Sequence, residues 1–152
     1  MRRIVEDDLS GAAIRALLTE HFEAMLANSP AGMCHFLDFE GLKAPGVTFW
    51  SAHEGGALVA CGAMKRLSAD HGELKSMRTH RDHLRRGHAA GMLAHIADVA
   101  RAEGMTRLSL ETGTGPAFEP AIALYTAHGF ERCEPFADYV ATDFNIFLTR
   151  RI

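Results

Sequence analysis

The sequence lacks the features that would place a protein in a membrane or in an oxidising compartment. No apolar run approaches the roughly 18 residues that a membrane span requires, and residues 1–8 turn acidic where a signal peptide needs an apolar stretch. The cysteines Cys34, Cys61 and Cys133 are far apart and form no Cys-x-x-Cys pair. We therefore expect a cytoplasmic protein with reduced thiols that is neither secreted nor embedded in a membrane.

The sequence also has little excess of either charge and no sign of internal division. It holds 16 lysines and arginines against 19 aspartates and glutamates, and the net charge of −3 gives no general attraction to nucleic acid or anionic lipid. It contains no repeat, low-complexity tract or long linker. A chain of 152 residues can bury roughly 70% of the surface that its unfolded form exposes. The sequence therefore predicts a single domain over residues 1–152.

The spacing of apolar residues predicts an α/β fold with a mixed sheet. Expected strands are 2–6, 47–53, 58–67, 73–79, 107–111, 130–136 and 143–150, and expected helices are one from Ser10, its cap, to near Asn28, then 87–103 and 120–128. Gly55 and Gly56 fit a hairpin turn between the second and third strands. Segment 35–45 is predicted as a short helix or an irregular loop.

A basic segment directly precedes the helix predicted at 87–103. Between Arg78 and His88 the chain carries four arginines and three histidines against one acid, Asp82. The segment ends at Gly87, so unpaired backbone N–H groups, the positive end of the helix dipole and arginine side chains converge there. The small residues that would let a pyrophosphate approach the backbone closely are Gly87, Ala89 and Ala90. These features predict a phosphate pocket, and the alternative is a solvated basic loop.

Two other interpretations of the basic segment have less support. His80, His83 and His88 have no cysteine nearby, and their spacing does not match a closed structural zinc site, so we expect no metal. Four arginines in a chain of net charge −3 are a weak basis for contacts to nucleic acid, so we expect no nucleic-acid partner.

Three segments follow one another in a characteristic order. They are a strand at 74–79, the basic loop at 84–89 and a helix at 121–130 with the pattern Ala-x-x-Leu-Tyr-x-x-x-Gly-Phe. This arrangement covers nearly the whole chain and resembles the GNAT superfamily of acyl-CoA-dependent N-acyltransferases. The loop departs from the family pattern, because Leu84 replaces a Gln or Arg and His88 replaces an aliphatic residue. The resemblance implies a mixed, mostly antiparallel sheet of about six to seven strands flanked by about four helices.

The resemblance implies acetyl-CoA as the acyl-donor cosubstrate, with its pantetheine arm in a wedge between the central strand and its successor. The implied cofactor-binding residues are Met77, Arg78 and Thr79 on the strand, Arg85, Arg86, Gly87, His88, Ala89 and Ala90 in the loop, and Thr112 and Gly113 past the next strand. Most phosphate contacts would come from backbone N–H groups. The departure at Leu84 should therefore weaken binding rather than abolish it.

The implied reaction is direct attack of a neutral amine on the thioester. A backbone N–H near Met77 would stabilise the oxyanion, and Tyr125, which matches the family's helix tyrosine, is the expected general acid, with core packing as its alternative role. Glu73 and Glu111 are the candidates for taking the proton of an ammonium acceptor, and surface ion pairing is their alternative role. Glu73 ranks slightly ahead, and it shares a face with Met77 if no bulge interrupts the strand.

The sequence leaves the acceptor and the assembly state open. The acceptor is a small-molecule or peptide amine, and acids beside aromatics at 36–40 and 137–139 suit a cationic one, although they serve equally as surface acids over a core. The alternative function is a non-catalytic acyl-CoA-binding module on the same fold. The alternating Phe144, Ile146 and Leu148 suit either an edge strand that pairs two copies into a homodimer or an internal strand.

Overall fold

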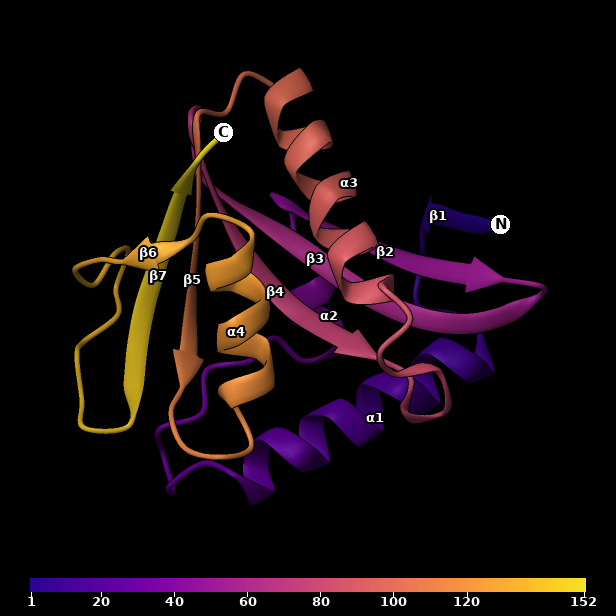
Figure 1. Ribbon diagram of the computed structural model, residues 1–152, viewed down its shortest axis with the longest axis horizontal. Helices are drawn as coiled ribbons and strands as arrows, with labels where there is room; N and C mark the ends of the chain where they lie inside the picture. Colours follow the sequence, from indigo (N-terminus) through magenta and orange to yellow (C-terminus); the bar gives the residue numbers. More distant parts are fainter.

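The computed structural model describes residues 1–152 and contains one seven-stranded sheet with helices on both faces (Figure 1). The elements in chain order are β1 (Arg2–Glu6), α1 (Ala12–Ala27), α2 (Phe39–Leu42), β2 (Val47–Glu54), β3 (Ala57–Ser68), β4 (His71–Thr79), a 3-10 turn (Arg81–His83), α3 (His88–Ala102), β5 (Arg107–Gly113), α4 (Glu119–Ala127), β6 (Glu131–Arg132) and β7 (Asn145–Arg151). The strand order is β1-β2-β3-β4-β5-β7-β6. Only β4 and β5 pair in parallel, so the predicted mixed, mostly antiparallel sheet is confirmed.

Two apolar clusters fill the two faces of the sheet. The larger one lies under α3 and α4, where Met92 and Ile96 are fully buried. The smaller one joins α1 and α2 to the β2–β3 hairpin through residues such as Leu18, Leu42 and Phe49. The sheet is therefore covered on both sides. None of the helices has both the length and the apolar character that crossing a bilayer would take.

Two predicted elements differ in the structure. Helix α1 begins at Ala12 with Gly11 as its N-cap, and the Ser10 hydroxyl instead bonds Asp8 Oδ1 at 2.6 Å, so the predicted Ser10 cap is wrong. The strand predicted at 130–136 shortens to β6, since Pro135 has no N–H to donate and the chain beyond it leaves the sheet. The hairpin turn is as predicted, with positive φ at both of its glycines.

Strand β7 lies inside the sheet, between β5 and β6. Its residues Ile146 and Leu148 belong to the larger apolar cluster, with 8% and 2% of their surface exposed. Their alternation therefore serves a strand inside the sheet, which β6 covers at Leu148 and Thr149, and the homodimer stays a prediction.

Candidate active site

Strands β4 and β5 diverge after a short paired stretch and leave a cavity between them. They pair only from His71 to Glu73 against Arg107 to Ser109. Beyond these residues a cavity of about 120 Å³ opens in the wedge. Its lining consists of His21 and Met25 from α1, His35 and Phe36 from the next loop, residues 73–77 of β4, residues 110–112 of β5, and Phe118, Ala121 and Tyr125 at α4. All three predicted catalytic residues, Tyr125, Glu73 and Glu111, therefore face one cavity.

A bulge in β4 decides which of its side chains lie together. The register between β3 and β4 shifts opposite Gly62, and Ser76 adopts a left-handed φ of 56°. The extra residue turns Met77 toward α3, and its sulfur would lie 2.7 Å from a Cβ at Gly62, so a larger residue there would displace Met77 and its neighbour Met92. Glu73 and Lys75 stay together on the other face of the strand. Glu73 and Met77 were expected to share a face only in an uninterrupted strand, and this condition is not met because the bulge shifts the alternation by one residue.

Tyr125 reaches the cavity from α4. The residue is 7% exposed, and its ring packs edge-on against Phe130 with the ring centroids 5.6 Å apart. Burial alone raises the pKa of Tyr125 above its ordinary value, with no contribution from a hydrogen bond. The phenol is therefore protonated at neutral pH, and it has a proton to donate into the cavity.

Glu73 belongs to a closed cluster with Lys75 and Tyr139. Lys75 Nζ lies 3.3 Å from Glu73 Oε2 and 2.8 Å from the Tyr139 hydroxyl, which itself donates to the same carboxylate oxygen. The side chains of Glu73 and Lys75 are only 3% and 9% exposed. Burial, followed by the hydrogen bond to Glu73, raises the pKa of Tyr139. The charge of Glu73 is thus compensated inside the cluster.

Glu111 belongs to a second cluster, which is open. Its Oε2 lies 2.7 Å from His35 Nδ1 and accepts a hydrogen bond from Asn145 Nδ2 at 3.1 Å. The amide oxygen of Asn145 accepts the Thr142 N–H at 2.8 Å, so this partner is fixed. The Glu111 side chain is 8% exposed, whereas His35 is 38% exposed. No local pattern in the sequence marks His35, because it meets Glu111 across 76 residues of chain and no motif contains both.

His21 covers the cavity from α1. It is 7% exposed, and its Nδ1 is buried without a hydrogen-bond partner. Burial, followed by the charge of Arg78, lowers the pKa of His21 from 6.5 to about 4. The imidazole is therefore neutral at pH 7.

The loop before α3 presents free backbone N–H groups. Arg85 and Gly87 both have positive φ, 61° and 79°, and Gly87 is the N-cap of α3. The N–H groups of residues 84–90 meet no acceptor in the protein. Such groups at a helix N-terminus suit an anion. The side chains of Arg85 and Arg86 are exposed beside them.

His88 turns away from this loop into the protein. It is 2% exposed, and its Nδ1 accepts a hydrogen bond from Arg2 Nε at 3.0 Å. The Arg2 guanidinium lies across α3 at Gly91, where any side chain would collide with it. Burial, followed by the charge of Arg2, lowers the pKa of His88. The backbone N–H of His88 has no acceptor in the protein, and its imidazole ties β1 to α3.

The remaining predicted cofactor residues differ in their surroundings. Thr112 lines the cavity, whereas Gly113 is packed against two phenylalanine rings and does not. Arg78 turns to α1, where its Nη2 lies 3.4 Å from Glu20 Oε1. Thr79 is the last residue of β4 and leads into the basic segment, and the small Ala89 and Ala90 form the first turn of α3.

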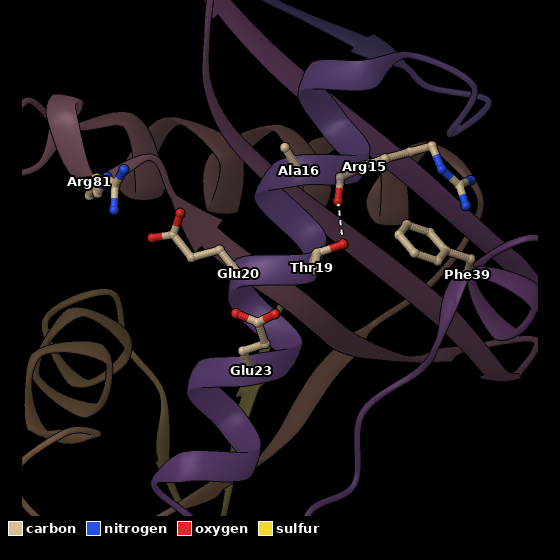
Figure 2. Close-up of a pocket in the computed structure, with 7 residues that line it drawn as sticks. All are labelled: Arg15, Ala16, Thr19, Glu20, Glu23, Phe39 and Arg81. Atoms are coloured by element: carbon tan, nitrogen blue, oxygen red, sulfur yellow. Dashed lines mark hydrogen bonds between the residues drawn. The ribbon is translucent and has the colours of Figure 1, made fainter.

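A wider hollow of about 560 Å³ lies on the outer side of α1 (Figure 2). Figure 2 shows Glu20 and Arg81 on one side of the helix and Arg15 beside Phe39 on the other, where the guanidinium carbon lies 4.1 Å from the ring centroid. Most of its lining is exposed, and it contains none of the catalytic candidates. The smaller cavity between β4 and β5 is therefore the candidate active site.

The histidines and cysteines form no metal-binding group. No three or more His, Cys, Asp or Glu side chains are arranged to hold a metal ion. His80 Nδ1 instead accepts the Asp82 N–H at 3.1 Å. The three cysteines are free thiols.

Comparisons with known proteins agree on one family. The acetyltransferase (GNAT) family matches residues 12–130. A Bacillus subtilis protein described as an uncharacterized N-acetyltransferase is 48% identical over 146 residues, 96% of this chain and 97% of that protein. An Escherichia coli protein with the same description is 48% identical over 149 residues, 98% of this chain and 94% of that protein.

Solved structures share the fold. A Klebsiella pneumoniae protein described as a putative acyl-CoA N-acyltransferase superposes with a TM-score of 0.80 at 24% identity, covering 99% of this chain and 97% of that one. A GNAT family acetyltransferase from Elizabethkingia anophelis with acetyl-CoA bound gives a TM-score of 0.69 at 13% identity, covering 99% and 98%. Because these identities are only 24% and 13%, the structural likeness establishes the fold alone.

Proposed function

The chain belongs to the GNAT family of acetyltransferases and is an N-acetyltransferase, and from this premise we propose that residues 1–152 form one catalytic domain that moves the acetyl group of acetyl-CoA to a primary amine. One observation carries the proposal: the unpaired edge of β4 runs past the cavity and leads into the loop with free N–H groups. The pantetheine arm pairs with that edge, and the diphosphate binds the loop. The structural neighbour with bound acetyl-CoA supports this choice of donor.

The cavity residues take distinct roles in this proposal. The amine attacks the carbonyl carbon of the thioester directly, and a backbone N–H near Met77 donates to the oxyanion. The bulge places Ser76 and Met77 outside the β3–β4 register, which supports this role. Tyr125 donates its proton to the departing sulfur, in keeping with its raised pKa and its place in the cavity.

The acceptor in this proposal is a cationic primary amine on a small molecule or a peptide. Lys75 compensates the charge of Glu73, whereas Glu111 has only Asn145 and His35 as partners. The cavity therefore carries one carboxylate that no lysine or arginine compensates. A protonated amine would be attracted to it, and a carboxylate-bearing face of the acceptor would be repelled.

Calorimetric titration with acetyl-CoA tests the donor site. Gly87→Asp and Gly87→Asn are matched variants, since both side chains tolerate positive φ and only the first adds a negative charge at the loop. We expect the Asp variant to bind at least about tenfold more weakly than the Asn variant, equivalent to about 1.4 kcal/mol. Equal binding by the two variants would contradict the proposed phosphate site.

Tyr125→Phe tests the chemistry separately from binding. We expect acetyl-CoA binding within about twofold of the wild type and a kcat lower by about 10²-fold, because only the proton donor is lost. Unchanged turnover would remove Tyr125 from the mechanism.

A further inference from the structure

We propose that His35 takes the proton of the acceptor amine and that Glu111 positions it, an inference that rests on the proposed acetyl transfer. This makes His35 the catalytic residue and Glu111 a positioning residue. His35 lies on the loop between α1 and α2, apart from every sequence motif of the site. Its place in the cavity lining puts it where an acceptor must approach the wedge.

The bond to Glu111 fixes the tautomer of His35. A carboxylate only accepts hydrogen bonds, so the nitrogen that lies 2.7 Å from Glu111 Oε2, Nδ1, carries the proton. Nε2 is left with a lone pair and has no hydrogen-bond partner in the protein. The ring is also fixed by an edge-on contact with Tyr139, with the centroids 5.4 Å apart. His35 is thus an oriented imidazole with a free acceptor nitrogen.

The carboxylate also stabilises the product of proton uptake. When Nε2 is protonated, the imidazolium lies against the negative charge of Glu111, which stays in place because Asn145 holds it at 3.1 Å. The exposed part of His35 gives the proton a route to solvent. Neither step requires movement of the buried cluster around Glu73.

The other groups of the cavity lack this combination. The charge of Glu73 is compensated by Lys75, its carboxylate accepts a hydrogen bond from Tyr139, and its side chain is almost fully buried. His21 has a pKa of about 4, which makes it a weak base, and it makes no hydrogen bond that would orient it. His35 alone joins an orienting carboxylate, a free nitrogen and contact with solvent.

The proton balance of the reaction closes with these residues. One proton of the ammonium group passes to His35 Nε2 and from there to solvent. The neutral amine then forms the C–N bond and gives a tetrahedral intermediate with a negatively charged oxygen. Its collapse breaks the C–S bond, and Tyr125 protonates the sulfur. The second proton of the amine restores the Tyr125 hydroxyl. The products are an amide, the free thiol of coenzyme A and one released proton.

The test measures kcat/KM with acetyl-CoA for a panel of primary amines, from strongly basic butylamine to weakly basic trifluoroethylamine, at one pH. His35→Asn is the informative variant, because its amide nitrogen keeps the bond to Glu111 but takes up no proton. His128→Asn is the matched control, since His128 is an exposed histidine bonded only to Leu124 O at the end of α4. Acetyl-CoA binding is measured for each variant by calorimetry.

We expect His35→Asn to lower kcat/KM by about 10²-fold for strongly basic amines and by less than about threefold for amines that are already neutral. Glu111→Gln should show the same selectivity with a smaller loss. A uniform loss over the panel, or none, would overturn the role of His35 while leaving acetyl transfer intact. A wild type that binds acetyl-CoA and acetylates no amine would overturn the proposed function and this inference with it.

Discussion

Glu73 and Glu111 face the same cavity from neighbouring strands, yet their partners differ in kind. Glu73 is bonded to a cation and a phenol in a cluster that is almost fully buried. Glu111 is bonded to an amide and to an imidazole that reaches solvent. The two carboxylates therefore differ in their surroundings: the first cluster joins β4 to the loop after β6, and the second reaches solvent through His35.

The largest expected effect comes from opening the closed cluster. Lys75→Met leaves Glu73 buried without its cation, and we expect the free energy of unfolding to fall by about 3 kcal/mol. Urea unfolding measures the loss, and Lys43→Met, at an exposed lysine, is the control. The double variant Glu73→Gln, Lys75→Met should recover more than half of the lost free energy of unfolding, because it buries no uncompensated charge. A fall in the free energy of unfolding of less than about 1 kcal/mol would show that Lys75 does not compensate the charge of Glu73.

Removing the charge of the open cluster should affect catalysis instead. Glu111→Gln keeps an oxygen that accepts from His35 and Asn145, so we expect the free energy of unfolding to stay within about 1 kcal/mol. We expect kcat/KM for a strongly basic amine to fall by at least about tenfold and at most about 10²-fold, or 2.7 kcal/mol. We measure kcat/KM and urea unfolding for both Glu111→Gln and Glu73→Gln, and we expect the larger loss of kcat/KM in Glu111→Gln. The opposite pattern, with Glu73→Gln the slower enzyme, would reverse the assignment.

The comparison extends to the two histidines of the cavity, because His21 lacks the carboxylate that His35 has. The pKa of His21 is about 4 in the folded protein and 6.5 in the unfolded chain, so the unfolded state binds the proton first as pH falls. Its contribution to stability is present above pH 6.5 and is lost between about pH 6.5 and 4, by about 2 kcal/mol from pH 7 to pH 5. His21→Phe should flatten this dependence in urea unfolding at pH 7 and pH 5. An equally steep loss in the variant would assign the acid sensitivity to other groups.

Much of the fold was predictable because its signals are local. Two adjacent glycines with positive φ make the β2–β3 turn, and Gly104, with φ of 89°, follows the C-cap of α3. The helical spacing of apolar residues indicated α1 and α3. The family resemblance added the mixed, mostly antiparallel character of the sheet and its approximate number of strands.

The arrangement of the site depended on contacts that no local pattern encodes. The bulge at Ser76 accompanies the packing of Met77 over Gly62, and the sequence gives no sign of a positive φ at a serine. His35 reaches Glu111 only because the loop after α1 folds back to the end of β5. The sequence identifies both Glu73 and Glu111 as candidates for the proton acceptor. Choosing between them depends on their hydrogen-bond partners, Tyr139 and His35, which are distant in the sequence.

The smallest expected effect tests whether the two clusters are independent. Tyr139→Phe removes the hydroxyl that bonds Glu73 and Lys75 but leaves their direct 3.3 Å contact, so the charges remain compensated. We expect the free energy of unfolding to fall by about 1 kcal/mol, the usual contribution of a buried hydrogen bond. The phenyl ring keeps its edge-on contact with His35, so kcat/KM should stay within about twofold. A tenfold loss of activity would mean that the hydroxyl transmits the state of Glu73 to His35, in which case the two carboxylates would act as one coupled system.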